Sequence, residues 1–167
     1  VAHGLMQGGH DGARASLAKF WESVSKLGAM LNPVAAMAGS NLLTSSGPNP
    51  VLATQQWAME SFTRTFSPYQ FNPLNANPLR DLLASCVDFE ALRHCGVVKL
   101  FLCATNVRSG KIRVFSGAEI TPDALLASAC LPTVFQAVEL DDPVTGQREA
   151  FWDGGYTGNP ALFPLYD

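Results

Sequence analysis

The residues best placed to do chemistry are an acid and two glycines in the run Trp152-Asp153-Gly154-Gly155. The acid directly follows a predicted strand, and in open α/β sheets functional sites gather where strands end and loops begin. The two glycines allow a sharp turn and the close approach of another backbone or a ligand. An Asp held there can act as a general base toward a nearby hydroxyl, or it can orient a His. Asp-Gly is also a common turn dipeptide, so these four residues alone leave a plain turn open as the alternative.

Other polar residues are weaker candidates. His94 could in principle complete a Ser-His-Asp triad, but the sequence has no G-x-S-x-G motif to present the serine. A surface histidine at a helix end is the favoured interpretation. A different kind of α/β hydrolase would need a usable His after its acid, and none follows His94. Asn106 and Asn159 could shape a site around Asp153, although an asparagine satisfied within its own loop is the commoner case.

We find no metal or cofactor motif in the sequence. The four cysteines are too far apart for a CxxC pair, and the three histidines form no HxxxH pair. No P-loop and no GxGxxG motif is present, so we expect neither a cofactor nor a bound metal. We expect the cysteines to be small core residues in a reducing compartment, although a disulfide stays possible: Cys86, Cys95, Cys103 and Cys130.

Composition limits the class of protein. The chain has 167 residues, which is enough for one domain with a substantial core. Hydrophobic residues make up 47% and charged residues 15%, which argues against disorder. A net charge of -3 gives no basic excess for binding nucleic acid. No apolar run approaches the ~20 residues that span a bilayer, and no signal peptide is visible, so we expect a cytoplasmic location.

The elements that must position Asp153 alternate between helix and strand, which predicts an α/β fold. A nearly continuous apolar run predicts a buried central strand over residues 97–104, followed by a turn at 108–110 and a strand over 111–115. A second predicted hairpin pairs residues 136–140 with 148–152 and leads directly into Asp153. Periodicity, caps and stops predict helices over residues 11–27, 54–66, 78–83, 89–93 and 122–130.

Several local details follow from the helix patterns. Thr54, Asn77, Asp88 and Thr121 are the expected N-caps, and Gly28 is the expected end of the first helix. Phe20 and Trp21 are expected in the core. We predict a long apolar loop over residues 29–53. It is either a functional loop, such as a lid or a binding loop, or a connector packed on the surface.

Three segments, in this order and spacing, resemble the C-terminal half of the patatin-like phospholipase family. They are LCATNVRSG at residues 102–110, ASACLPTVF at 127–135 and WDGGYTGNP at 152–160. In the family a strand ending in ATN or ATD leads to a hairpin, then to a helix with the pattern A-S-x-x-x-P-x-x-F, and then to the Asp-Gly-Gly turn. Each segment alone is a weak signal, but the ordered set is fairly specific and covers about residues 78–164.

The resemblance implies a lipid acyl hydrolase that acts on a phospholipid or another acyl ester through a Ser-Asp dyad. Asp153 would accept the proton of the serine as it attacks the ester carbonyl, and would later activate water on the acyl-enzyme. Gly154 and Gly155 would form the supporting turn. The family serine sits in a G-x-S-x-G elbow, which this sequence lacks, as it lacks the glycine-rich oxyanion loop.

We therefore expect residues 1–167 to be part of a single patatin-like acyl hydrolase domain that is inactive alone. The expected architecture is an open sheet with flanking helices, without the N-terminal strands and the nucleophile elbow, and the first residues would finish the helix that follows the elbow. A lipid substrate implies transient contact with a membrane surface. The alternative is a non-catalytic lipid-binding or protein-interaction domain of the same fold.

The dyad hypothesis makes a geometric demand. The Asp153 carboxylate should lie at the rim of a pocket, on the face of the sheet that carries the start of the first helix. It should be partly exposed and free of an Arg or Lys partner, since a tight ion pair would weaken it as a base. A plain turn residue would point to the opposite face or use its oxygens in turn hydrogen bonds or a salt bridge.

Overall fold

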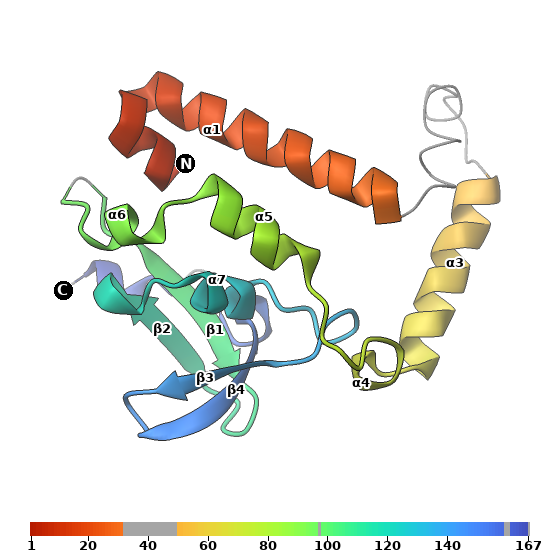
Figure 1. Ribbon diagram of the computed structural model, residues 1–167. Helices are drawn as coiled ribbons and strands as arrows, with labels where there is room; N and C mark the ends of the chain where they lie inside the picture. The colour runs from red at the N-terminus through yellow and green to blue at the C-terminus, as the bar shows by residue number, and fades with distance from the viewer. Residues whose placement is uncertain (32–49, 97, 159–160, 167) are drawn as a thin grey trace.

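A computed structural model describes residues 1–31, 50–96, 98–158 and 161–166 (Figure 1). Its helices are α1 (Ala2–Leu31), α3 (Pro50–Thr65), α4 (Pro68–Phe71), α5 (Pro78–Cys86), α6 (Phe89–Arg93) and α7 (Pro122–Ser128). Its strands are β1 (Phe101–Asn106), β2 (Ile112–Ser116), β3 (Val138–Asp142) and β4 (Gln147–Asp153). Most of the predicted apolar loop, residues 32–49, lies outside the described residues, and its two ends belong to α1 and α3.

The strands form a four-stranded antiparallel sheet in the order β2-β1-β4-β3. The predicted mixture of helices and strands, both predicted hairpins and the interior position of the first strand are confirmed, while the patatin-like form of the sheet stays a prediction. The first strand, however, begins at Phe101 and includes Thr105 and Asn106, which the sequence placed at its end. These two polar residues stay in the strand because their side chains find hydrogen-bond partners within the fold.

Three of the helices, α7, α5 and α1, are stacked in layers on one face of the sheet. The short helix α7 packs against β1, β3 and β4, α5 packs on α7, and α1 packs on α5 (Figure 1). Phe151 of β4 is fully buried at the centre of the core, and burying such a side chain contributes about 1.5–3 kcal/mol. It is surrounded by buried residues of β1, β2, α7 and the segment before α7: Leu102, Ala104, Phe115, Ile120, Ala124 and Ala127.

Three of the four predicted helix caps are confirmed. The side chains of Asn77, Asp88 and Thr121 accept first-turn backbone N–H groups of α5, α6 and α7 at 3.1, 2.9 and 3.1 Å. The fourth prediction, a cap at Thr54, is wrong because α3 begins at Pro50, and proline suits the first position of a helix. The predicted end of α7 at Cys130 is also late by two residues, since the helix ends at Ser128.

The first helix differs most from its prediction. It consists of two helical arms separated by non-helical backbone at Gly8 and Gly9, and Gly9 has a left-handed φ of 59°. The short arm folds back on the long one so closely that a Cβ on Gly4 would lie 2.8 Å from Cα of Ala13. The predicted stop at Gly28 is wrong, since the long arm continues to Leu31.

Phe20 and Trp21 of this helix were both predicted to lie in the core, and the structure buries them to different extents. Phe20 is half-buried, but Trp21 is 58% exposed and touches Phe20 edge to face, with ring centroids 5.6 Å apart. The reason is geometric: α1 packs chiefly against α5 and touches α6, so only a narrow stripe of the helix is covered.

Candidate functional site

Asp153 is the last residue of β4, and the chain then makes the 3-10 turn Gly154–Tyr156 (η2). Alternate residues of a strand share a face, so Asp153 lies on the same face as Phe151. Ala104 stands directly opposite Asp153 in β1 and belongs to the same core. That face is the one covered by α7, α5 and α1, and it is the face that the dyad hypothesis requires.

The peptide of Asp153 is held on both sides. Its N–H donates to the carbonyl of Cys130, in the loop after α7, at 2.9 Å. Its carbonyl accepts from the hydroxyl of Thr105 on β1 at 2.8 Å. The backbone N–H of Gly155 donates to the side-chain oxygen Oδ1 of Asp153 at 2.7 Å. Three separate segments therefore fix this one residue.

The two glycines of the turn serve different purposes. A Cβ on Gly154 would lie 2.8 Å from the carbonyl carbon of Cys103 and closer still to its oxygen, so only glycine fits against β1. A Cβ on Gly155 would meet only the carboxyl group of Asp153 itself, at 3.0 Å from Oδ1. Gly154 therefore allows the turn to pack on the sheet, and Gly155 leaves room for the carboxylate.

Asp153 is half-buried, and its carboxylate is only partly used by the turn. Within the described ranges it forms no ion pair with any Lys or Arg, and no hydrogen bond reaches its second oxygen, Oδ2. One oxygen is thus fixed by the turn, as a plain turn residue would be, while the other is able to accept a proton. This geometry combines features of both alternatives that the sequence left open.

A buried thiol is part of the electrostatic environment of Asp153. Burial raises the pKa of Cys130 to about 11, and the negative charge of Asp153 adds to that rise, while a backbone hydrogen bond at Val138 opposes it. The thiol is therefore protonated at neutral pH, and it donates to the carbonyl of Gln136 at 3.2 Å. A protonated, buried thiol is a poor nucleophile, so Cys130 is a structural neighbour of Asp153.

Asn106 has a structural role, as the favoured interpretation held. Its Oδ1 accepts the backbone N–H groups of Arg108 and Ser109 at 3.0 and 2.9 Å, which closes the turn between β1 and β2. Its Nδ2 donates to the buried Glu149 at 3.3 Å. Both the oxygen and the nitrogen of the amide are engaged, and none of these bonds is directed at Asp153. Asn159, the other candidate, lies outside the described residues.

His94 is the exposed C-cap of α6, and its ring nitrogen Nε2 lies 3.0 Å from Glu90. The favoured interpretation, a surface histidine at a helix end, is confirmed. Within the described part of the chain no group of three or more His, Cys, Asp or Glu side chains could hold a metal ion. The four cysteines are free thiols, of which Cys103 and Cys130 are buried as expected and the other two are half-buried.

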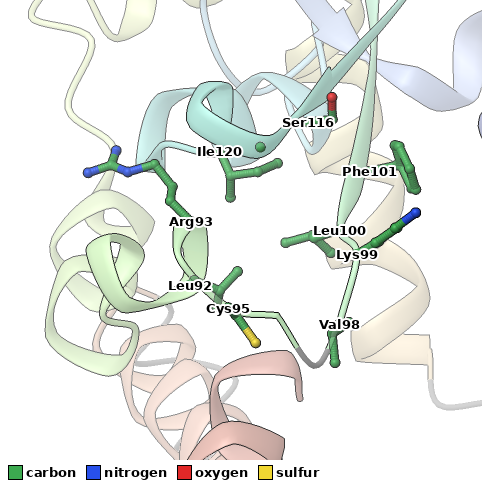
Figure 2. A pocket seen from close by; sticks show the side chains of 10 residues that line it. Leu92, Arg93, Cys95, Val98, Lys99, Leu100, Phe101, Ser116 and Ile120 are labelled. Atoms are coloured by element: carbon green, nitrogen blue, oxygen red, sulfur yellow. The ribbon is translucent and has the colours of Figure 1, made fainter.

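Two cavities lie away from Asp153. One, of about 270 Å³, lies between α6 and the start of β1; in Figure 2, Leu92, Leu100 and Ile120 border it while the nitrogen ends of Arg93 and Lys99 point away. The other, of about 300 Å³, lies between α1, α5 and α7. Asp153 lines neither cavity, so its predicted place at the rim of a pocket stays a prediction.

Thr105 is the residue of this site that the sequence interpretation missed. The sequence placed it at the end of a strand, whereas the structure directs its hydroxyl to the backbone of Asp153, 48 residues later. The signal that could have found it is its central position in the ATN segment, which was already part of the resemblance.

Comparisons of the chain with protein-family models, curated proteins and solved structures found no match.

Proposed function

We propose that this chain is part of a patatin-like lipid acyl hydrolase in which Asp153 is the general base. The base would act on a serine nucleophile, and these 167 residues contain no G-x-S-x-G motif that would present one. The observation that supports it is the carboxylate of the half-buried Asp153 at the end of β4. It lies on the helix-covered face with Oδ1 fixed by Gly155 and Oδ2 open. A site of this kind is pre-organised, since the base is held before the substrate arrives.

The proposed chemistry needs no cofactor. Oδ2 of Asp153 accepts the proton of the serine hydroxyl while the serine oxygen forms a bond to the carbonyl carbon of a phospholipid or another acyl ester. As the tetrahedral intermediate collapses, the ester C–O bond breaks and the alcohol leaves with the proton from Asp153. A water molecule then gives its proton to Asp153 and attacks the acyl-enzyme, and the serine regains its proton as the fatty acid leaves.

We expect the purified 167-residue chain to hydrolyse no p-nitrophenyl ester above the buffer rate. The reason is that the Asp153 carboxylate, even when well positioned, cannot replace the covalent step of a serine nucleophile. Release of p-nitrophenol measures the rate, and a fluorophosphonate probe shows whether any serine is activated. The proposal requires a longer protein that carries this serine, and that protein should react with both reagents. Asp153-dependent hydrolysis by the short chain would show instead that its own residues supply the nucleophile.

An exposed group of aromatic residues supports contact with a lipid surface. This aromatic surface, on α3 and the segment after it, consists of Trp57, Phe62, Phe66, Tyr69 and Phe71. Phe62 is 4.9 Å from Phe66 and 5.4 Å from Phe71 between ring centroids, so these three rings form one cluster, and Trp57 and Tyr69 are exposed on the same stretch of chain. In Figure 1, α3 stands at the side of the molecule, apart from the sheet. Trp and Tyr side chains, here Trp57 and Tyr69, are favoured at membrane–water interfaces.

Replacing Trp57 by Ala is expected to weaken binding to phosphatidylcholine vesicles by about 3- to 30-fold, somewhat less than full burial of an aromatic ring would give. Co-sedimentation with vesicles measures the partition coefficient. Val144→Ala is the matched control, because Val144 is an exposed apolar residue in the turn between β3 and β4, away from the aromatic surface. Equal partitioning of Trp57→Ala and the unmodified chain would exclude Trp57 as a lipid contact.

The alternative, a non-catalytic lipid-binding or protein-interaction domain, is also supported by the aromatic surface. One comparison distinguishes the two functions: the longer protein would bind vesicles but fail to react with a fluorophosphonate if it were only a binding domain.

None of the helices in the described part of the chain has both the length and the apolar character to cross a membrane. A cytoplasmic location stays a prediction.

A further inference from the structure

We infer that the hydroxyl of Thr105, supported by that of Thr157, is the device that positions Asp153 for proton transfer; this rests on the proposed function. Thr105 is only 5% exposed, and its Oγ1 lies 2.8 Å from the Asp153 carbonyl oxygen and 2.9 Å from Oγ1 of Thr157. Neither hydroxyl bonds to the carboxylate itself. Thr105 is therefore a positioning residue and acts through the backbone of Asp153.

The direction of the two hydrogen bonds follows from the number of protons. A threonine hydroxyl carries a single proton, and that of Thr105 is donated to the carbonyl of Asp153. The 2.9 Å contact between the hydroxyls therefore has Thr157 as donor and Thr105 as acceptor. The result is a directed chain from Thr157 through Thr105 to Asp153, in which each bond polarises and strengthens the next.

This chain lies where the strand pairing stops. β1 and β4 are paired over three residue pairs, and the last pair joins Ala104 to Asp153. Beyond it the backbone turns into η2, so no further ladder bond supports the turn. The Thr105 hydroxyl binds the carbonyl of the last paired residue and so supplies the missing support. Thr157 belongs to the turn as well, because its N–H donates to the carbonyl of Gly154 at 3.2 Å.

The consequence for the carboxylate is a loss of freedom. The backbone of Asp153 is fixed at its N–H by Cys130 and at its carbonyl by Thr105, and Gly155 then fixes Oδ1. These three bonds together restrict the positions that Oδ2 can take. Removing the Thr105 hydroxyl releases the carbonyl and lets the turn drift, and a shift of ~1 Å at a reacting group can lower the rate by ~10²-fold.

The test compares Thr105→Val, which keeps the shape but removes the hydroxyl, with Thr105→Ser, which keeps the hydroxyl. In the longer protein we expect Thr105→Val to lower kcat by about 10- to 100-fold with KM for a soluble ester nearly unchanged, as expected for a displaced base. Thr105→Ser should restore most of kcat. In an Asp153→Asn background, Thr105→Val should lower the remaining rate by less than about twofold, because the two residues act as a unit.

Thr157→Val is the second variant, since Thr157 is exposed and its loss spares the core. We expect it to lower kcat in the same sense, but less than Thr105→Val does. Thr121→Val removes a helix-capping hydroxyl on α7 that does not contact Asp153, so it should lower the melting temperature and leave kcat unchanged. Faster hydrogen exchange at the Gly155 amide in Thr105→Val would report the loosened turn independently of activity.

The outcomes distinguish the positioning role of Thr105 from the proposed function of Asp153. Full kcat in a folded Thr105→Val protein, together with an inactive Asp153→Asn protein, would overturn the positioning role alone. A Thr105→Ser variant that is as slow as Thr105→Val would also overturn it, because the hydroxyl would then not be the group that matters. An Asp153→Asn protein with full activity would overturn the proposed function and this inference with it.

Discussion

Asp153→Asn in the longer protein is expected to lower kcat for ester hydrolysis by at least ~10³-fold, the scale of losing a positioned general base. An amide fills the same volume as the carboxyl group but cannot accept the serine proton. The fold should be unaffected, because the amide oxygen of Asn can still accept the N–H of Gly155 that Oδ1 accepts now. Steady-state kinetics with p-nitrophenyl butyrate and a thermal melting curve measure the two effects separately.

Asp141→Asn is the matched control for this substitution. Asp141 is an exposed residue of β3, and its side chain lies 3.9 Å from Arg148 on the surface. An exposed ion pair of this kind contributes about 1 kcal/mol at most, so the control should keep both activity and stability. If Asp153→Asn behaves like Asp141→Asn, with most of kcat retained and an unchanged melting curve, then Asp153 is only a turn residue.

Local signals in the sequence predicted well those features that a few neighbouring residues decide. Asn77, Asp88 and Thr121 cap their helices as predicted, because each bond joins residues two or three positions apart. The tight turn after β1 was also predicted, and Gly110 there has a left-handed φ of 66°. Asp153 was placed correctly at the end of a strand for the same reason, since the strand pattern and the glycines lie directly beside it.

Features decided by tertiary contacts were not predictable in the same way. Gly28 looked like a helix stop, yet the break lies at Gly8 and Gly9, where the short arm of α1 folds onto the long arm. Glycine permits a helix to end but does not require it, so packing decides which glycine is used. Trp21 looked like a core residue by its spacing, but too little of the molecule covers its side of α1.

The candidate site shows the same division. The acid and its glycines could be found from the sequence, because they are consecutive. The groups that hold them could not, since Cys130 and Thr105 lie 23 and 48 residues away along the chain and contact Asp153 only after the sheet has formed. A sequence interpretation that ends at a motif therefore identifies the reacting group and misses the groups that orient it.

Gly154→Ala is expected to lower the free energy of unfolding by about 2–3 kcal/mol, the cost of overpacking a tight site. The added methyl group would lie 2.8 Å from the carbonyl carbon of Cys103 and 3.1 Å from its Cβ. This neighbour is backbone of the central strand, so it cannot move without disturbing the three residue pairs that join β1 to β4. Urea denaturation measures the change, which is a large part of the 5–15 kcal/mol by which a typical domain is stable.

Gly155→Ala is the comparison that makes this result specific. Its methyl group would meet only the Asp153 carboxyl group, at 3.0 Å from Oδ1, and a side-chain oxygen can shift by a few tenths of an ångström. The free energy of unfolding should therefore change by less than about 1 kcal/mol, as at most exposed positions. Because the shifted oxygen belongs to the proposed base, this variant should lose kcat in the longer protein while it keeps its stability. Equal stability losses in the two variants would show that the glycines are needed for the same reason, and that Gly155 has no separate connection to the carboxylate.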